Sequence, residues 1–265
     1  MSDLKPQVYK DTRPAEHFQP FHDRVRANDP NWVYTMVRST VTPPVVLGMR
    51  TRCIGLHHVP TDGPLIVAPN HFSQWDHFIT GAYLRRRINF MAKSQMFSNK
   101  FFEFIFSRGG TFPVLRGRND TESLKTAFAI LERDGLLLMY PEGGRSRTKG
   151  ELGQPKHGLG RIVMESGAPV VPVAIHGSDQ LRSWRERLKS LKLPHAVTVQ
   201  YGEPMHFEHK PDASREEHQE VSDQVFGRIR EMYTNLSAAL EAHPRRVVLR
   251  AAREGSLPEL AAGSS

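Results

Sequence analysis

The sequence predicts an α/β fold with a mainly parallel central sheet and helices on both faces. Short apolar runs at 65–68, 136–140 and 170–175 show no polar alternation, as expected of strands that are covered on both sides. Segments with helical periodicity lie between these runs, and strands that alternate with helices favour parallel pairing. The 265 residues suffice for one sizeable α/β domain with appendages.

The charge and the cysteine content narrow the classes of function. The formal net charge is +8 and the pI is about 9.8, which favours anionic partners such as a phospholipid surface, a phosphate-bearing substrate or nucleic acid. The single cysteine, Cys53, excludes an internal disulfide framework and a cysteine-based metal cluster, so no metal site is expected. A reducing cytoplasmic compartment fits this cysteine usage.

Residues 1–50 are predicted to form a polar N-terminal arm followed by an amphipathic, membrane-proximal segment. The first 30 residues carry many charges and lack the apolar core of a signal peptide. The most apolar stretch, 32–49, contains Arg38 and two prolines at 43–44, so it lacks the roughly 20 uninterrupted apolar residues of a membrane span. This stretch can lie on a membrane surface or pack as a helix on the main domain, and the sequence leaves both open.

A histidine and an aspartate five positions apart follow the predicted strand 65–68. On a continuous helix, residues five apart point about 140° away from each other, because each residue turns about 100°. His71 and Asp76 can meet if His71 lies in a turn and Asp76 in the first turn of a helix that Ser73 caps. Asp76 would then orient His71 as a general base. The chain has 13 histidines, so a chance spacing at a capped helix is the alternative.

The region after this pair contains an unusual density of aromatic residues. The helix that starts at Ser73 is predicted to end near the three arginines at 85–87, and a strand at 88–92 then leads to Lys93. A helix over the next segment, 96–106, would be apolar nearly all round. Such a segment usually packs into the core, but it can also form a wall for an acyl chain or a surface that enters a bilayer.

The predicted strand 136–140 runs into a loop with the character of an anion site. Two glycines, Gly143 and Gly144, permit a tight turn with exposed backbone N–H groups. Arg145 adds a planar guanidinium group that is suited to phosphate. A surface loop that merely holds the charged residues Glu142 and Arg145 is the alternative.

The other predicted elements complete the alternation of strands and helices. They are a strand at 111–115 that delivers Arg116 to its end, a helix capped by Asp120 or Thr121, a helix at 158–165, strands at 170–175 and 196–201, and a late helix over about 221–240. We therefore expect a domain at 51–242 and a flexible tail at 243–265. Function in such folds gathers beyond the carboxyl ends of the strands, where His71, Arg116 and the loop 142–145 are expected to lie.

Two short motifs together resemble a known family. The motifs are Asn70-His71-x-Ser73-x-x-Asp76 and Pro141-Glu142-Gly143-x-Arg145-Ser146. They resemble those of the glycerolipid acyltransferases of the 1-acylglycerol-3-phosphate acyltransferase type, and the likeness extends from about residue 59 to 175. The segments 110–116 and 170–175 are similar to two further blocks of that family, in the same order. Gly144 stands where the family usually has threonine.

The resemblance implies a fold, a reaction and a set of site residues. His71 would be the general base and Asp76 its orienting residue. The site for the acceptor phosphate would comprise Arg116, Glu142, Gly143 and Arg145, with Lys93 and Lys156 as weaker candidates. Glu142 would orient Arg145 or accept a bond from a glycerol hydroxyl, and the turn at 143–144 would supply N–H donors to an oxyanion.

The resemblance also implies the partners. The donor would be acyl-CoA or acyl carrier protein, and the acceptor would be lysophosphatidic acid. The protein would act in phospholipid synthesis as a peripheral protein on the cytoplasmic face of an anionic membrane. No metal or tightly held cofactor is implied. The acceptor could instead be glycerol 3-phosphate, another lysophospholipid or a glycolipid, since Gly144 departs from the pattern. A basic membrane- or nucleic-acid-binding module without chemistry is a further alternative, but the sequence shows no recognised nucleic-acid motif.

Overall fold

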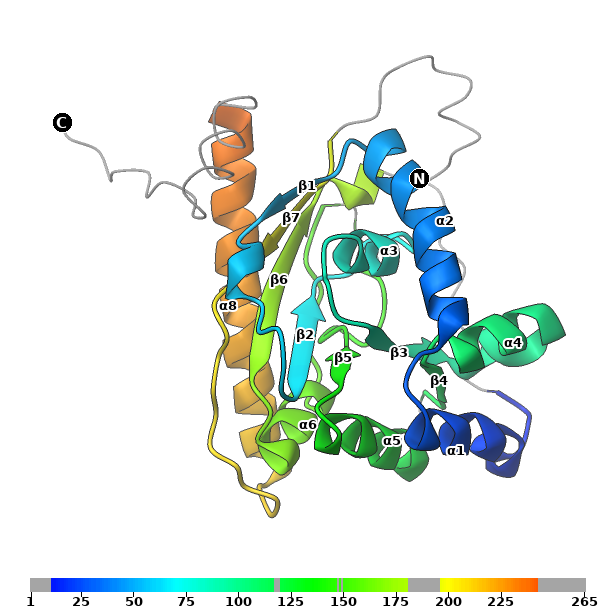
Figure 1. Cartoon of the computed structure of the whole chain (residues 1–265). Helices are drawn as coiled ribbons and strands as arrows, with labels where there is room; N and C mark the ends of the chain where they lie inside the picture. Colours follow the sequence, from blue (N-terminus) through cyan, green and yellow to red (C-terminus); the bar gives the residue numbers. More distant parts are fainter. Residues whose placement is uncertain (1–10, 117–119, 147, 149, 181–195, 243–265) are drawn as a thin grey trace.

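The computed structural model describes residues 11–116, 120–146, 148, 150–180 and 196–242, and it confirms the predicted α/β fold. Within these residues, the strands form one seven-stranded sheet in the order β1-β7-β6-β2-β5-β3-β4 (Figure 1). The strands are β1 (Arg52–Ile54), β2 (Leu65–Pro69), β3 (Ile88–Lys93), β4 (Thr111–Val114), β5 (Leu136–Leu138), β6 (Val170–His176) and β7 (Thr198–Tyr201). Neighbouring strands are parallel except β6 and β7.

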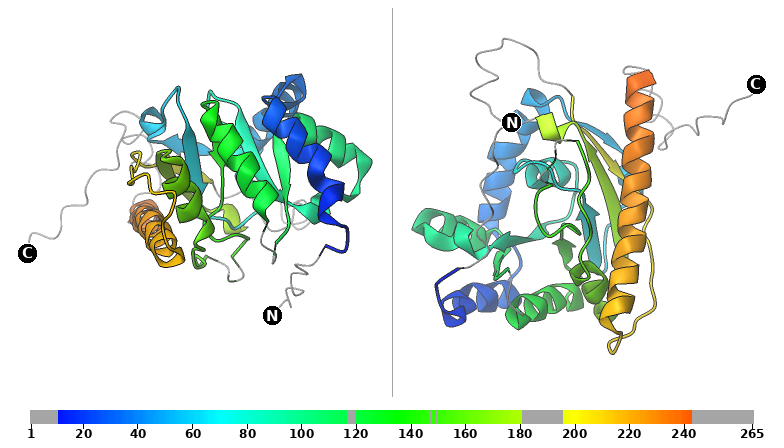
Figure 2. Two further views of the ribbon diagram at one scale, coloured as in Figure 1. Left: turned by 90° about the horizontal axis from the view of Figure 1, so that it is seen from below. Right: turned by 180° about the vertical axis from the view of Figure 1, so that it is seen from behind.

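Helices cover both faces of the sheet. The α-helices are α1 (Gln19–Ala27), α2 (Trp32–Gly48), α3 (Asp76–Gly81), α4 (Lys100–Arg108), α5 (Thr121–Glu132), α6 (Gly158–Ser166) and α8 (Arg215–Ala242). Short 3-10 helices are η1 (Ala15–Phe18), η2 (Leu56–His58), η3 (Ser94–Ser98) and η4 (Ser178–Gln180). Figure 2 shows α1, α5, α6 and α8 side by side on one face of the sheet, and α2 and α3 lie on the other.

The alternation of side chains along β2 explains the two cores. Ile66 and Ala68 point into the core beneath α5, α6 and α8, while Leu65 and Val67 point into the core beneath α2 and α3. All four side chains are fully buried. An uninterrupted apolar run is therefore the correct signature of a parallel strand that lies between two helical layers.

The N-terminal helices differ from the expected polar arm. Phe18, His22 and Val25 are buried, and α1 packs against α5. The guanidinium group of Arg133 donates to the backbone carbonyls of Val25 and Arg26, both at 2.7 Å, and so fixes the end of α1. Residues 15–27 are thus part of the packed fold, whereas the predicted tail at 243–265 lies outside the described residues.

The apolar stretch at 32–49 folds as the single helix α2, which continues through Pro43 and Pro44. Tyr34 and Val45 face the sheet, so this segment packs on the main domain along one side. Among the described residues, no helix is both long enough and apolar enough to cross a membrane.

The helix after the His71 motif is shorter than predicted. It begins at Asp76 instead of Ser73, and it ends at Gly81, well before the arginines at 85–87. One of these arginines, Arg86, donates to the carbonyl oxygens of Gly63 and Asp134 at 2.6 and 2.5 Å. It therefore joins two loops at the opposite edge of the sheet, and one of these loops follows the end of α5.

Candidate active site

The candidate site lies at the edge of the sheet where β2, β5, β3 and β4 end. His71 follows β2 and Glu142 follows β5, and these two strands are neighbours and parallel. Asn70 anchors the first loop, because its side-chain amide donates to the Ile175 carbonyl at 3.1 Å and accepts from the Ile175 N–H at 2.7 Å. This loop, residues 70–75, is called the histidine loop below. It is bonded to β6 on one side and lies next to β5 on the other.

The predicted contact between His71 and Asp76 is confirmed. Nδ1 of His71 lies 2.9 Å from Oδ2 of Asp76, and the carboxylate is completely buried. The same oxygen accepts the N–H groups of Phe72 and Ser73 at 2.8 and 2.7 Å, which fixes its position. With Nδ1 held in this way, Nε2 is the nitrogen of His71 that can accept a proton. The geometry is that of an oriented general base, and the catalytic role itself stays a prediction.

Two aromatic side chains that sequence reasoning missed surround the His71 imidazole. The Tyr140 ring stacks on it with centroids 3.8 Å apart and an angle of 19° between the planes, and the His77 ring meets it edge-on at 5.3 Å. Tyr140 is the last residue before the Pro141-Glu142 motif and His77 follows Asp76, so adjacency to the two motifs was the available signal. Together with the Asp76 hydrogen bond, the stacking leaves the imidazole little freedom to rotate.

The environment keeps both neighbours uncharged near neutral pH. Burial, together with the proximity of His71, lowers the pKa of His77 to about 4. Burial raises the pKa of the Tyr140 phenol well above its ordinary value. With neutral aromatic rings on this side, the Asp76 carboxylate is the acidic group that contacts the imidazole ring of His71.

We expect His77 to make the fold less stable as the pH falls from about 6.5 to about 4. In the unfolded chain His77 binds a proton near pH 6.5, whereas in the folded protein it does so only near pH 4. The unfolded state therefore binds more protons in this window, and the free energy of unfolding decreases as the pH falls. Urea unfolding at pH 7.5 and 5.0 measures this decrease, which should be smaller in His77→Asn. An equal decrease in the free energy of unfolding in the two proteins would contradict the lowered pKa of His77.

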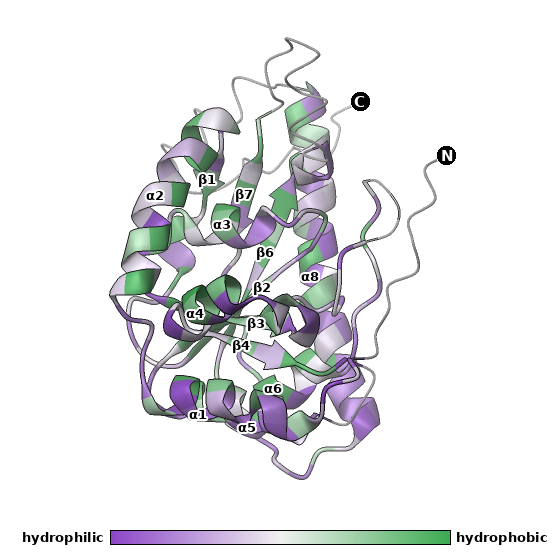
Figure 3. Cartoon of the chain, turned by 90° about the vertical axis from the view of Figure 1, so that its right-hand side faces the viewer, coloured by the Kyte–Doolittle hydropathy of each residue, from purple (hydrophilic) through white to green (hydrophobic). Residues whose placement is uncertain are grey.

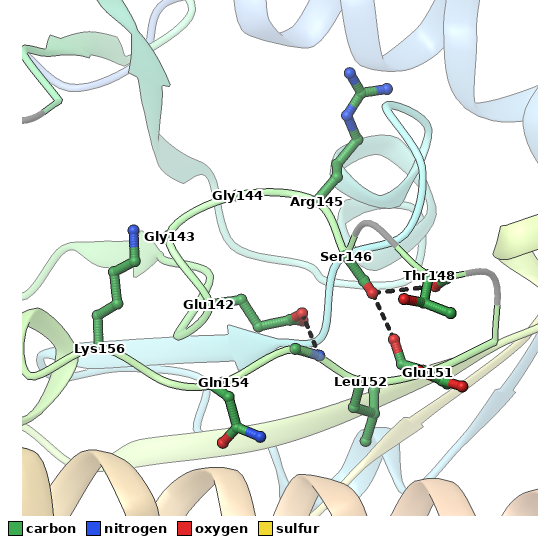
Figure 4. Close-up of a pocket in the computed structure, with 11 residues that line it drawn as sticks. Glu142, Gly143, Gly144, Arg145, Ser146, Thr148, Glu151, Leu152, Gln154 and Lys156 are labelled. Carbon is green, nitrogen blue, oxygen red and sulfur yellow. Dashed lines mark hydrogen bonds between the residues drawn. The ribbon is translucent and has the colours of Figure 1, made fainter. Parts of the chain in front are cut away.

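Glu142 connects the histidine loop to the predicted anion-binding loop at 142–145, which we call the phosphate loop. It is only 6% exposed, and its Oε1 accepts the His71 N–H at 2.8 Å. Its Oε2 accepts the Gly153 N–H, also at 2.8 Å (Figure 4). The Ser146 N–H also donates to the His71 carbonyl at 2.8 Å. Burial raises the pKa of Glu142 to about 7 although the two backbone bonds oppose this shift.

Glu142 has a positioning role that the sequence did not predict, and its contact with a glycerol hydroxyl stays a prediction. Both of its oxygens already accept backbone N–H groups, so the carboxylate serves to position the two loops. Arg145 points away from Glu142 in Figure 4, which differs from the expectation that Glu142 orients it.

Gly143 also differs from its expected role as a donor. Its N–H donates to the Tyr140 carbonyl at 3.0 Å and so closes the turn after β5. Its φ of 65° lies in the left-handed region, and a Cβ at this position would lie 3.1 Å from Cδ of Lys156. Gly143 is therefore required by the shape of the turn.

The phosphate loop borders an open pocket of about 370 Å³. Its lining includes four of the predicted phosphate-site residues, namely Glu142, Gly143, Arg145 and Lys156. Arg145 and Lys156 are exposed and bring two positive charges to its rim. The described residues contain no group of three or more histidine, cysteine or acidic side chains that is placed to hold a metal ion.

The other two predicted phosphate ligands lie further along the same edge. Lys93 is exposed at the end of β3, and Arg116 is half-buried just after β4. β4 is three strands away from β2, a separation of about 14 Å at the usual strand spacing. The structure thus places Arg145 and Lys156 together at one pocket, while Lys93 ends β3 and Arg116 follows β4, the next two strands along this edge after β5.

Known proteins are similar to the part of the chain that holds this site. The family model described as Acyltransferase matches residues 50–176, which hold His71, Asp76, Arg116 and the Glu142–Arg145 loop, so this part of the chain is similar to an acyltransferase domain. The chain is 29% identical over 199 residues to the 1-acyl-sn-glycerol-3-phosphate acyltransferase of Bacillus subtilis, covering 72% of this chain and 94% of that protein. It is also 29% identical over 135 residues to the chloroplastic 1-acyl-sn-glycerol-3-phosphate acyltransferase BAT2 of Brassica napus, covering 50% of this chain and 39% of that protein.

A solved structure supports the fold. The crystal structure of the 1-acyl-sn-glycerophosphate (LPA) acyltransferase PlsC from Thermotoga maritima superposes with a TM-score of 0.58, covering 84% of this chain and 89% of that one. The two sequences are 20% identical, so the likeness concerns the arrangement of the elements.

Proposed function

We propose that this protein transfers a fatty acyl group from an acyl thioester to the hydroxyl of a lysophosphatidic acid-type acceptor in phospholipid synthesis. The observation that carries the proposal is the His71–Asp76 pair, fixed at 2.9 Å within the segment that matches the acyltransferase family. The pair is tied to a loop whose pocket is lined in part by Arg145 and Lys156. The relatives named 1-acyl-sn-glycerol-3-phosphate acyltransferases support the choice of acceptor.

The proposed reaction follows from the geometry of His71. Nε2 of His71 removes the proton of the acceptor hydroxyl while the hydroxyl oxygen attacks the thioester carbonyl. The tetrahedral intermediate then collapses, the carbon–sulfur bond breaks, and the leaving thiolate takes the proton from the imidazolium. Asp76 holds the Nδ1 proton and stabilises the imidazolium throughout. The protein supplies no covalent nucleophile, and the transfer requires no metal or tightly held cofactor.

The donor and the membrane contact belong to the same proposal. Acyl-CoA or acyl carrier protein delivers the acyl group, and the protein works peripherally on an anionic membrane surface at the cytoplasmic face. The net charge of +8 supports this partner. Glycerol 3-phosphate, another lysophospholipid or a glycolipid stays the alternative acceptor.

Thiol release from palmitoyl-CoA, with and without lysophosphatidic acid, tests the proposal. Release that depends on the acceptor and on His71 is the expected result. Release without an acceptor would instead make the protein a thioesterase. Release only with one of the other acceptors would replace lysophosphatidic acid in the proposal.

Arg145→Ala is expected to raise the KM for lysophosphatidic acid by about 10- to 100-fold with little change in kcat, since a charged hydrogen bond contributes about 1.5–3 kcal/mol. Arg145 lies exposed at the pocket rim, so the substitution should leave the fold intact. The matched control is Arg161→Ala, which removes a partly exposed arginine of α6 that pairs with Glu165. An unchanged KM in Arg145→Ala would remove this residue from the phosphate site.

A further inference from the structure

Most of the large apolar side chains that are exposed in the described residues gather on one part of the surface. Seven of the eight belong to α2, η3 and α4, and one of these seven, Leu47, lies near the far end of α2. We call the other six the aromatic face: Trp32, Met36, Met96, Phe101, Phe102 and Phe104. Phe101 and Trp32 are 65% and 63% exposed. Figure 3 shows the hydrophobic colouring of α4 and α2 on the side that faces the viewer. A cluster of this kind on a protein surface indicates a binding surface.

Packed aromatic rings beneath the surface support the aromatic face. Phe97 is fully buried, its ring lies 5.5 Å from that of Phe106, and Phe106 in turn stacks on Phe102 at 5.6 Å. The Asn31 N–H, just before α2, donates to the Arg108 carbonyl at the end of α4 at 3.1 Å, which joins the two helices. The exposed rings are therefore held outward by the fold.

Cationic side chains accompany the exposed rings. Lys93 and Lys100 are exposed just before η3 and at the start of α4. The guanidinium group of Arg108 lies 4.0 Å above the Phe104 ring. Aromatic rings with flanking lysine and arginine match the interface of an anionic bilayer, where rings enter the headgroup region and cations pair with lipid phosphates. A second copy of this chain, with its net charge of +8, lacks that complementary charge.

The aromatic face is close to the candidate site along the chain and in space. η3 begins directly after β3, at the strand end that shares its edge of the sheet with His71. Phe90 in β3 lies 5.9 Å from the ring of His77, which in turn contacts His71. A bilayer that contacts α4 therefore lies beside the strand edge at which a lipid acceptor reacts.

We infer that the aromatic face is the surface by which the protein docks on an anionic lipid bilayer. The inference rests on the proposed function only in that a lipid acceptor has to reach the site from a membrane. The exposed phenylalanines enter the headgroup region, and Lys93, Lys100 and Arg108 contact the lipid phosphates.

Flotation with vesicles of phosphatidylcholine containing phosphatidylglycerol tests this inference on the full chain. Phe101→Ser/Phe102→Ser is expected to weaken vesicle binding by at least about tenfold, because two aromatic rings no longer enter the interface. The matched control is Leu47→Ser. Leu47 is 76% exposed but lies at the other end of α2, about 22 Å along the helix from Trp32. Its substitution should leave binding within twofold of that of the unsubstituted protein.

Two further measurements distinguish the outcomes. Transfer between octanoyl-CoA and a monomeric short-chain lysophosphatidic acid should be equal in the double variant and the unsubstituted protein, which shows that the variant is folded. Equal vesicle binding by the double variant overturns the inference while the transfer reaction stands. Loss of a dimer in the double variant without loss of vesicle binding also overturns it. Weakened vesicle binding in a protein that transfers no acyl group would uphold the docking surface and reject the proposed function.

Discussion

His71→Ala is expected to lower the kcat for acyl transfer by about 10³-fold or more. A positioned general base contributes about 10²–10⁴-fold to a rate, and Nε2 of His71 is the nitrogen that the Asp76 contact leaves for this task. The fold should persist, because Asp76 still accepts the N–H groups of Phe72 and Ser73 after the imidazole is removed. Thiol release from palmitoyl-CoA in the presence of lysophosphatidic acid measures the effect.

The matched control for this variant is His57→Ala. His57 is an exposed histidine of η2 that lies outside both motifs, before β2, and its replacement should leave kcat unchanged. Circular dichroism and vesicle flotation should give the same result for His71→Ala as for the unsubstituted protein. Substantial transfer by folded His71→Ala protein would refute the proposed mechanism.

Asp76→Asn is expected to lower kcat by about 10²–10⁴-fold with little change in KM. An amide does not stabilise the imidazolium, and its N–H₂ group favours the wrong tautomer of the histidine; the corresponding change in a Ser-His-Asp triad lowers kcat by about 10⁴-fold. Asp76→Ala should in addition destabilise the protein by several kcal/mol, roughly 1–3 kcal/mol for each buried donor that loses its acceptor. These donors are Nδ1 of His71 and the N–H groups of Phe72 and Ser73.

Comparison of the two Asp76 variants separates catalysis from folding. Urea unfolding should show a large loss of stability in Asp76→Ala and a smaller one in Asp76→Asn, whereas both variants should lose transfer activity. If Asp76→Asn kept the kcat of the unsubstituted protein, Asp76 would serve only to stabilise the turn before α3, and the orienting role would be rejected.

The contact between His71 and Asp76 was predictable because it depends on local geometry. A strand, a turn and the start of a helix suffice to bring residues five apart together, and Asp76 has the side chain that caps such a turn. The alternation of apolar runs with helical segments likewise predicted the parallel sheet. Both predictions use interactions within a few residues or a periodic pattern, which a single sequence contains.

The features that the sequence did not predict depend on packing between residues that are far apart in the chain. The stacking of Tyr140 on His71 and the bond from Gly153 to Glu142 arise only when β5 lies beside β2 and the chain after the phosphate loop folds back. The helix α1 is polar on average, and its few buried residues gave too weak a pattern. For the segment 96–106, hydrophobicity alone did not distinguish a core helix from a surface helix, and packing on Phe97 decided which rings point outward.

The bonds made by Glu142 have a consequence for exchanging parts between relatives. The histidine loop, the phosphate loop and the segment at Gly153 are joined through one carboxylate, and the Ser146 N–H adds a second link to His71. They therefore form one structural unit. A chimera designed to change head-group preference has to carry residues 69–76 and 141–156 together. A loop transplanted alone would lack the hydrogen-bond partners that fix the position of His71.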